Sequence, residues 1–444
     1  MKVKRLPVDP GPAGWNSLLP PADTADTLST QTIADWLVIG AGFAGLSAAR
    51  RLAQLCPTDR IILLEASRVG EGPAGRNSGF MIDLPHDLAS ENYAGALDAD
   101  RLQIEDNRRA ITFAADMAQA FGLSPEAFAQ SGKINGAATE KGLHHNRTFA
   151  DHLAALGERF EMLDAQAMRD MTGTNYYQNG LFTPGAAIIQ PAMYVRAIAR
   201  ALRSNRLSIF ERSPVTALQR AGSDWQAETP QGRVTAPRVI LAVNGHLESF
   251  GHMQGRLMHV FTYASMTRAL TASECATLGG AQVWGLTPAD PLGTTVRRIS
   301  GQGGDRIVIR NRFTFDPSME VSDTRIAAVG RDHDAAFAAR FPMLADVDME
   351  YRWGGRLCLS YNNVQVVGEL EPGLWSACCQ NGLGTAKGTL AGLLAAEGAN
   401  GVTSGALSRA IGAPSPKKLP PAQIANLGAN VRLRWGEWRA GREL

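Results

Sequence analysis

Asp35-Trp-Leu-Val-Ile-Gly40-Ala-Gly42-Phe-Ala-Gly45 carries the clearest structural signal in this chain of 444 residues. Residues 35–40 are a short apolar run that ends in glycine, as a buried parallel strand does. A helical pattern follows from Gly42 to about Leu55, and residues 60–65 form the next apolar run. The sequence therefore predicts a strand–helix–strand unit with a glycine-rich turn after its first strand.

The glycines of this turn have the spacing G-x-G-x-x-G of dinucleotide-binding sites. The first glycine permits a tight turn, the second lets a pyrophosphate approach the backbone, and the third lets the helix pack on the sheet. The positive end of the helix dipole then faces the phosphates. An acid at the end of the second strand can accept hydrogen bonds from ribose hydroxyls. A glycine-rich turn without a ligand is the alternative. The predicted cofactor-binding residues here are Gly40, Gly42, Phe43, Ala44, Gly45, Glu65 and Ala66.

A second glycine-rich segment, Val69–Phe80, follows closely. A simple NAD domain has no need of it, whereas the ribityl chain and ring of a flavin extend beyond the pyrophosphate. A flexible surface loop is the alternative interpretation. We therefore favour FAD over NAD, and this segment adds Arg76, Asn77, Ser78 and Gly79 to the predicted cofactor-binding residues.

Together these motifs resemble the FAD-dependent D-amino-acid-oxidase family, in particular its branch of γ-glutamylputrescine oxidase-, sarcosine oxidase- and pipecolate oxidase-like enzymes. The similarity runs in order over about residues 33–400 and recurs at 189–191, 353–355 and 365–368. It implies that the backbone of Val215 meets the adenine. It also implies that the turn 381–385 lies at the flavin ring, through Gly382, Leu383, Gly384 and Thr385. The family often has His or Ser where this chain has Asn381, and a plain helix-capping turn is the alternative.

The resemblance implies an α/β fold: a Rossmann-like FAD-binding domain of the glutathione-reductase type with an inserted antiparallel-sheet substrate domain. We expect a discontinuous FAD-binding domain at 1–90, 191–250 and 351–412. Residues 91–190 and 251–350 would form the substrate domain, and 413–444 a C-terminal tail. The leader, residues 1–33, is expected to be irregular and to lie on the surface. Alternation within 255–350 predicts strands with one solvated face.

The function that the resemblance implies is oxidation of a C–N bond in a primary or secondary amine or amino acid. Hydride would pass to flavin N5 and leave an imine, and oxygen or another acceptor would then take the electrons. Two alternatives remain open: C–O oxidation of a hydroxy acid, and a flavin-holding subunit of a larger dehydrogenase complex.

Substrate-side residues are predicted on the strands of 255–350. His259, Phe261 and Tyr263 alternate and so share one face, which suits a pocket or an ordinary packed face. One of four arginines on a predicted hairpin could pair with a substrate carboxylate, although a solvated strand face is the alternative: Arg297, Arg298, Arg310 and Arg312. The predicted catalytic residues are His259, Tyr263 and Arg310.

The five cysteines are sparse and include no C-x-x-C pair, and we expect no metal. Cys378 and Cys379 lie in an apolar run and are expected to be buried thiols. Cys358 lies where some sarcosine oxidase-like relatives attach flavin covalently. Because γ-glutamylputrescine oxidase-like chains lack this cysteine, we expect non-covalent FAD.

A net charge of +2 and scattered aromatic residues favour no nucleic-acid partner. Residues 1–23 do not resemble a secretory signal, so a cytoplasmic location is expected. The tail places basic residues beside Trp435 and Trp438. These could contact a membrane surface and so a quinone. We instead expect the tail to pack against its own flavin domain or a second subunit.

Overall fold

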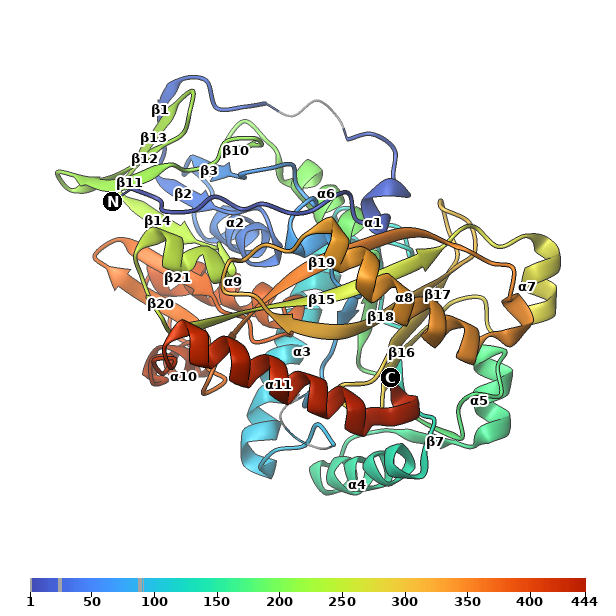
Figure 1. Cartoon of the computed structure of the whole chain (residues 1–444). Coiled ribbons are helices and arrows are strands. Elements are labelled where there is room, and N and C mark those ends of the chain that lie inside the picture. Colours follow the sequence, from blue (N-terminus) through green and yellow to red (C-terminus); the bar gives the residue numbers. More distant parts are fainter. Residues whose placement is uncertain (1, 23–25, 87–89, 91) are drawn as a thin grey trace.

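The computed structural model describes residues 2–22, 26–86, 90 and 92–444, and it shows a mixed α/β fold with two large sheets (Figure 1). The strand–helix–strand unit predicted from the opening motif is confirmed, because α2 (Phe43–Leu55) connects two parallel strands. The spatial order of the six-stranded sheet is β10 (Leu207–Phe210), β3 (Ile61–Leu64), β2 (Trp36–Ile39), β14 (Arg238–Leu241), β21 (Leu374–Cys378) and β20 (Val366–Glu371). All neighbours in it are parallel except β20 and β21.

Both faces of the six-stranded sheet are covered, so β2 and β3 are buried at every position. One face packs against helices α2, α3 (Leu97–Ala120), α6 (Pro191–Leu202) and α9 (Ala386–Ala399). A Cβ at Gly392 would lie 1.9 Å from the carbonyl oxygen of Ala44, so α2 and α9 need a glycine at their crossing. The other face packs against a four-stranded sheet of β1 (Gln31–Ile33), β13 (Arg233–Ala236), β12 (Asp224–Glu228) and β11 (Ala217–Ala221).

The second large sheet has eight strands and is mostly antiparallel. Its order is β19 (Met349–Ser360), β15 (Leu257–Thr267), β18 (Arg306–Phe315), β17 (Thr295–Ile299), β16 (Trp284–Pro288), β6 (Lys133–Ala137), β8 (Asn179–Thr183) and β7 (Glu161–Leu163). The predicted solvated face is wrong, since β15 is buried everywhere except at Met258. Two helices that the sequence analysis missed cover this region, α8 (Asp323–Arg340) and α11 (Ala422–Ala440).

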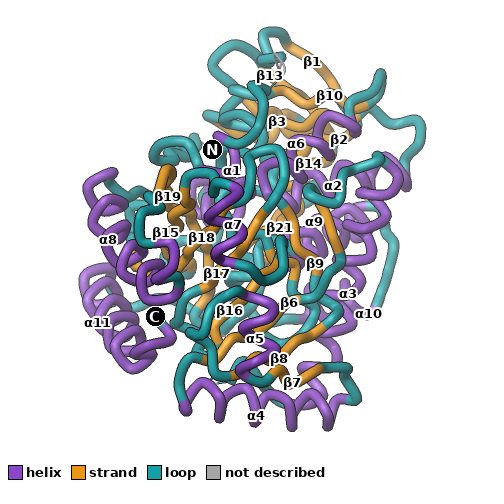
Figure 2. Tube along the Cα trace, turned by 90° about the vertical axis from the view of Figure 1, so that its right-hand side faces the viewer, coloured by secondary structure: helices purple, strands orange, loops and turns teal. Residues whose placement is uncertain are grey.

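The remaining elements are short or peripheral and surround the two sheets (Figure 2). A three-stranded sheet contains β4 (Phe80–Met81), β9 (Ala187–Ile189) and β5 (Phe128–Ala129). The other helices are α1 (Gly14–Ser17), α4 (Glu140–Leu156), α5 (Ala165–Thr172), α7 (Ala272–Leu278) and α10 (Gly405–Gly412). The 3₁₀ turns are η1 (Pro73–Gly75), η2 (Asn244–Phe250), η3 (Pro342–Leu344) and η4 (Gly441–Glu443).

Apart from α1 and β1 the described part of the leader is irregular, and most of residues 2–12 are exposed, as expected, but buried residues attach it to the body of the protein. The first part of the leader, residues 2–13 (the N-terminal segment), runs from β11 between the two large sheets to α1 (Figure 1). The amide of Val3 donates to the carbonyl of Thr216 at 2.8 Å. Trp15 is fully buried, with its ring edge against Trp353 and its Nε1 donating to the carbonyl of Asn77.

The chain crosses between the sheets more often than the predicted domain boundaries assume. β19 begins the predicted segment 351–412 but pairs with β15 in the eight-stranded sheet. α3, from the predicted segment 91–190, packs against α9 of the other domain. The boundaries themselves stay predictions. None of the helices among the described residues is long and apolar enough to cross a bilayer.

Candidate active site

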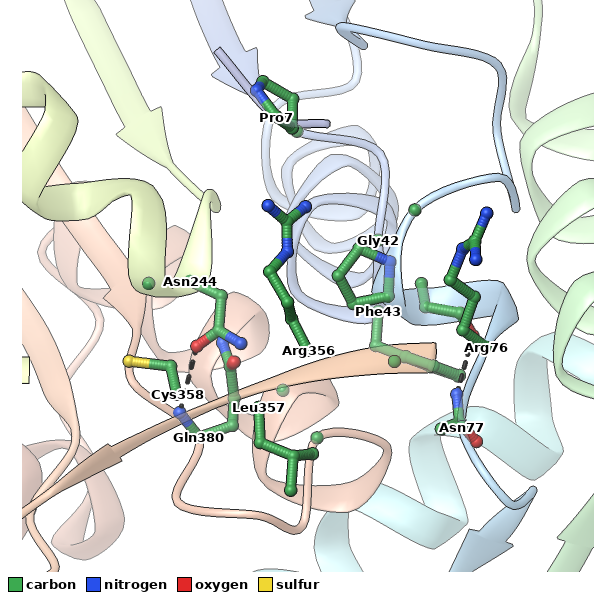
Figure 3. Close-up of a pocket in the computed structure, with 18 of the residues that line it drawn as sticks. Pro7, Gly42, Phe43, Arg76, Asn77, Asn244, Arg356, Leu357, Cys358 and Gln380 are labelled. Atoms are coloured by element: carbon green, nitrogen blue, oxygen red, sulfur yellow. Dashed lines mark hydrogen bonds between the residues drawn. The ribbon is translucent and has the colours of Figure 1, made fainter. Parts of the chain in front are cut away.

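One large pocket lies where the two large sheets meet, and segments distant in sequence line it. They are the N-terminal segment, the turns after β2 and β3, the loop at η1, the start of η2, strands β15, β18 and β19, and the turn before α9. Figure 3 shows Arg356 and Arg76 on either side of Phe43 in this pocket, with Pro7 of the N-terminal segment above them.

The turn after β2 is shaped to receive an anion. Gly40 has φ +104°, and a Cβ there would lie 2.6 Å from the carbonyl oxygen of Ala242. The first amides of α2 have no intrahelical acceptors, and its N-cap residue, Gly42, offers no side-chain acceptor either. These amides therefore stay available to a ligand in the pocket. A Cβ at Gly42 would meet only Ala74, at 3.5 Å, and would otherwise occupy the pocket. This arrangement fits a pyrophosphate.

Glu65 is fixed at the end of β3 by two backbone amides. Its Oε2 accepts from Ala41 at 2.8 Å and its Oε1 from Ser67 at 3.0 Å. Burial raises the pKa of Glu65, while the two amide hydrogen bonds oppose that shift. Glu65 lines the pocket and each of its carboxylate oxygens can accept a further hydrogen bond, so the residue fits a ribose hydroxyl pair.

Two buried arginines attach the N-terminal segment to the pocket. Arg76 donates to the carbonyls of Glu71 (2.6 Å), Pro10 (3.0 Å) and Gly354 (3.3 Å) and to that of Gly11. Its predicted role in cofactor binding is therefore combined with a structural one.

Arg356 is the second of these arginines and comes from β19. Its Nη2 lies 3.1 Å from Oδ2 of Asp9, and its Nη1 contacts Nε2 of His246 at 3.0 Å. Burial lowers the pKa of Arg356, which the carboxylate of Asp9 opposes. The sequence analysis missed this contribution of the leader entirely.

The turn before α9 borders the pocket through residues 380 and 382–385. Asn381 has φ +50°, and its Oδ1 accepts from the amide of Ser360 at 2.8 Å, so this unusual residue fastens the turn to β19. The Oγ1 of Thr385 donates to the carbonyl of Phe80 at 2.6 Å. A Cβ at Gly384 would meet nothing within 4 Å, so the open space beside it can admit a planar ring.

Most of the predicted cofactor-binding residues line this single pocket. Two do not. A Cβ at Gly45 would lie 1.7 Å from the carbonyl oxygen of Gly40, and one at Gly79 would lie 2.1 Å from Nη1 of Arg297. These two glycines therefore serve close packing. The residues that do line it are Gly40, Gly42, Phe43, Ala44, Glu65, Ala66, Arg76, Asn77, Ser78, Val215, Gly382, Leu383, Gly384 and Thr385.

The structure distinguishes among the four candidate arginines. Arg297 donates to the carbonyls of Ser78 and Ile189, and Arg298 donates to those of Ala281 and Gly279. Arg312 pairs with Asp332 and Glu437, each at 2.9 Å.

Arg310 alone among the four lines the pocket. Its guanidinium lies 4.6 Å from the ring centroid of Phe313, and no carboxylate of the described residues pairs with it. Burial lowers the pKa of Arg310 to about 10. The group is therefore still a cation at neutral pH, and it is accessible from the pocket.

His259 and Tyr263 also line the pocket, but each side chain already has a partner. His259 Nε2 lies 2.8 Å from Oε2 of Glu248. The Tyr263 hydroxyl contacts Oγ1 of Thr314 at 2.6 Å, and burial raises its pKa. Phe261 does not line the pocket, although it packs together with Tyr263 against Ile326 and Val329 of α8. The catalytic roles of His259 and Tyr263 stay predictions.

Two residues near Arg310 escaped the sequence analysis. His86 lines the pocket and stacks on Tyr93, with ring centroids 4.2 Å apart. Burial and the nearby cations Lys133 and Arg310 hold the pKa of His86 well below its usual range, so it is neutral.

Lys133 donates to Oγ1 of Thr287, a pocket residue, at 3.0 Å, and burial lowers its pKa to about 8. Lys133 lies in β6, which is buried at every position, and the residue types of that strand do not reveal this burial.

The cysteines are all free thiols, and Cys378 and Cys379 are buried as predicted. Cys358 lines the pocket, and its thiol is hydrogen-bonded to the free thiol of Cys379. This hydrogen bond and burial raise the pKa of Cys358 well above its usual range, which makes it a poor nucleophile.

The sequence profile of a family described as "DAO: FAD dependent oxidoreductase" matches residues 35–398. The chain belongs to this family. It is therefore an enzyme with FAD as its cofactor, and the pocket described above fits that group.

Curated relatives and a solved structure agree with the assignment to this family. The chain is 25% identical to "Probable oxidoreductase OrdL" of Rhizobium meliloti (strain 1021), over 88% of this chain and 89% of that protein. It is also 25% identical to "Gamma-glutamylputrescine oxidoreductase" of Escherichia coli (strain K12), over 84% and 85%. Glycine oxidase from Geobacillus kaustophilus superposes with a TM-score of 0.69 at 18% identity, covering 84% of this chain and 96% of that one.

Proposed function

We propose that this enzyme oxidises the C–N bond of an amine or amino acid that carries a carboxylate. The observation that supports this most directly is Arg310, the one candidate arginine whose guanidinium faces the pocket without a carboxylate partner among the described residues. A planar guanidinium binds a substrate carboxylate through two parallel hydrogen bonds. A relative named for γ-glutamylputrescine and a structural neighbour named for glycine support an amine or amino-acid substrate.

The cations around this end of the pocket would also prepare the substrate nitrogen. Arg310 and Lys133 both raise the local positive potential, and His86 is neutral. A positive potential disfavours an ammonium group, so the substrate amine would lose its proton before reaction. FAD, when bound, supplies the oxidising power that removes a hydride from the carbon next to nitrogen. The nitrogen lone pair then forms the C=N bond, and loss of an N–H proton gives the imine, which water hydrolyses.

For the cofactor we propose the Rossmann-like arrangement, with the first amides of α2 at the pyrophosphate and Glu65 at the ribose. Val215 would meet the adenine, and residues 382–385 would lie at the ring. The unreactive thiol of Cys358 supports non-covalent binding. After acid precipitation, all the yellow colour should remain in the supernatant, and colour in the pellet would contradict this assignment. The five free thiols are compatible with the cytoplasm as the proposed compartment.

An anaerobic titration of the purified protein tests the proposed reaction. Amino acids, N-methyl amino acids, cyclic imino acids, polyamines and hydroxy acids are added in turn while the flavin absorbance is recorded. Bleaching by a carboxylated amine and not by the matching hydroxy acid supports the proposal. Bleaching by a hydroxy acid alone would replace it with C–O oxidation. A flavin that no compound reduces would favour a partner-dependent subunit.

A further inference from the structure

Helix α11 lies across the front of β15 and β18 and is attached through one face (Figure 1). Ala425, Ala429 and Leu433 of this face pack against a cluster formed by Val260, Phe313 and Phe315. Glu437 has a fully buried side chain that accepts from the amide of Phe313 at 3.0 Å and pairs with Arg312. The tail thus packs on the eight-stranded sheet of its own chain, where we had expected the flavin domain or a second subunit.

The opposite face of α11 leaves large apolar side chains in solvent. Val431, Trp435 and Trp438 are 59%, 56% and 76% exposed. Their spacing of four and three residues places them on one side of the helix, where they form an apolar stripe. Packing against the sheet does not explain this stripe, because the inner face is already filled.

In residues 421–444 the acidic side chains are buried and the exposed charged side chains are basic. Both acids of residues 421–444, Glu437 and Glu443, are buried. The outward charges are basic, at Arg432, Arg439 and Arg442, and Arg439 lies over the Trp435 ring at 4.8 Å. The outer face therefore combines an apolar stripe with flanking positive charge only.

We propose that the outer face of α11 docks this enzyme on an anionic lipid bilayer. Tryptophan rings are stable at the boundary between headgroups and acyl chains, since one part of the ring is apolar and its N–H needs a polar partner. Arginines beside them would contact lipid phosphates, and each basic residue near an anionic surface raises partitioning about fivefold. The helix would lie in the plane of the bilayer surface, with the face that packs on β15 and β18 turned away from the lipid.

The charge pattern argues against the two competing occupants. A second copy of this chain that met the first through the same face about a two-fold axis would place arginines against arginines. Nucleic acid would use the basic residues and could stack on tryptophan, but it offers no counterpart for Val431 at the N-terminal end of the stripe. A bilayer accommodates the tryptophans, Val431 and the flanking arginines together.

Flotation of the FAD-bound protein with vesicles tests this proposal. Vesicles of phosphatidylcholine alone are compared with vesicles that also contain phosphatidylglycerol. We expect binding only to the anionic vesicles, and loss of binding at high salt. The double variant Trp435→Ala/Trp438→Ala should weaken binding at least about tenfold. The variant Arg432→Glu/Arg439→Glu should abolish it.

Matched controls separate this surface from general effects. Ile33→Ala/Val283→Ala removes exposed apolar side chains elsewhere, and Arg60→Glu/Arg147→Glu reverses exposed charges elsewhere. Both should bind vesicles like the parent protein, and all variants should keep their FAD and melting temperature. Absence of binding to anionic vesicles, or equal binding by the tryptophan variant, overturns the proposal. So does a dimer, or binding to single-stranded DNA, that the tryptophan variant abolishes in the absence of lipid.

Discussion

Asp9 and Arg356 form a buried ion pair of 3.1 Å that joins the N-terminal segment to β19 at the edge of the cofactor pocket. Both side chains are less than a tenth exposed. Removing one partner of such a pair leaves an uncompensated buried charge, which is costly.

We therefore expect Asp9→Ala to destabilise the protein by about 3 kcal/mol and to speed FAD dissociation. Urea unfolding followed by flavin fluorescence measures both effects. The control is Asp98→Ala, which breaks a solvent-exposed pair with Arg101 and should cost less than about 0.5 kcal/mol. Equal losses in the two variants would show that the pair at the pocket edge has no special role.

Glu65→Gln should weaken FAD binding by roughly ten- to a hundredfold. The two carboxylate oxygens accept from two amides, of Ala41 and Ser67, and a glutamine must turn its NH₂ group toward one of these donors. Titration of the apoprotein with FAD gives the dissociation constant. The exposed Glu105→Gln on α3 should bind FAD like the parent. Unchanged affinity in Glu65→Gln would remove the ribose assignment.

Arg310→Ala should raise KM about a hundredfold for a carboxylated amine that the enzyme oxidises. Arg310→Lys should restore part of this loss, because it keeps the charge but not the paired donors. The amide analogue of the same substrate should be affected little by either change. Arg331→Ala, on the exposed side of α8, is the control. A KM that is independent of residue 310 would place the carboxylate site elsewhere.

Lys133 should make stability depend on alkaline pH. Its pKa is about 8 in the folded protein and near 10.5 when unfolded, so the unfolded chain holds the extra proton between these values. The cost of burying the cation is fully present below pH 8 and disappears as pH rises to 10.5. The parent should therefore gain up to about 3 kcal/mol relative to Lys133→Met between pH 8 and 10. Parallel pH profiles of unfolding for the two proteins would contradict this assignment.

The parts of the site that could be predicted from the sequence are short motifs whose residues are close together in the chain. We predicted the turn at residues 40–45 and Glu65 because a pyrophosphate needs closely spaced glycines and a ribose needs an acid after the next strand. Both requirements are visible in the sequence. Arg310 could not be separated from Arg297, Arg298 and Arg312, because the direction of each side chain depends on where neighbouring strands and loops lie. The role of the leader was missed for a related reason. Its partners, Thr216 and Arg356, are remote in sequence. No motif in residues 2–13 indicates that this segment lines the pocket.

The N-terminal segment also imposes an order of events on protein synthesis. It is synthesised before Thr216 and Arg356, with which it makes its contacts. The ion pair that fixes this segment at the pocket edge can therefore form only after β19 has been made, and this side of the pocket stays open until that time. Refolding with FAD present from the start should accordingly yield more flavin per chain than adding FAD after the segment has docked.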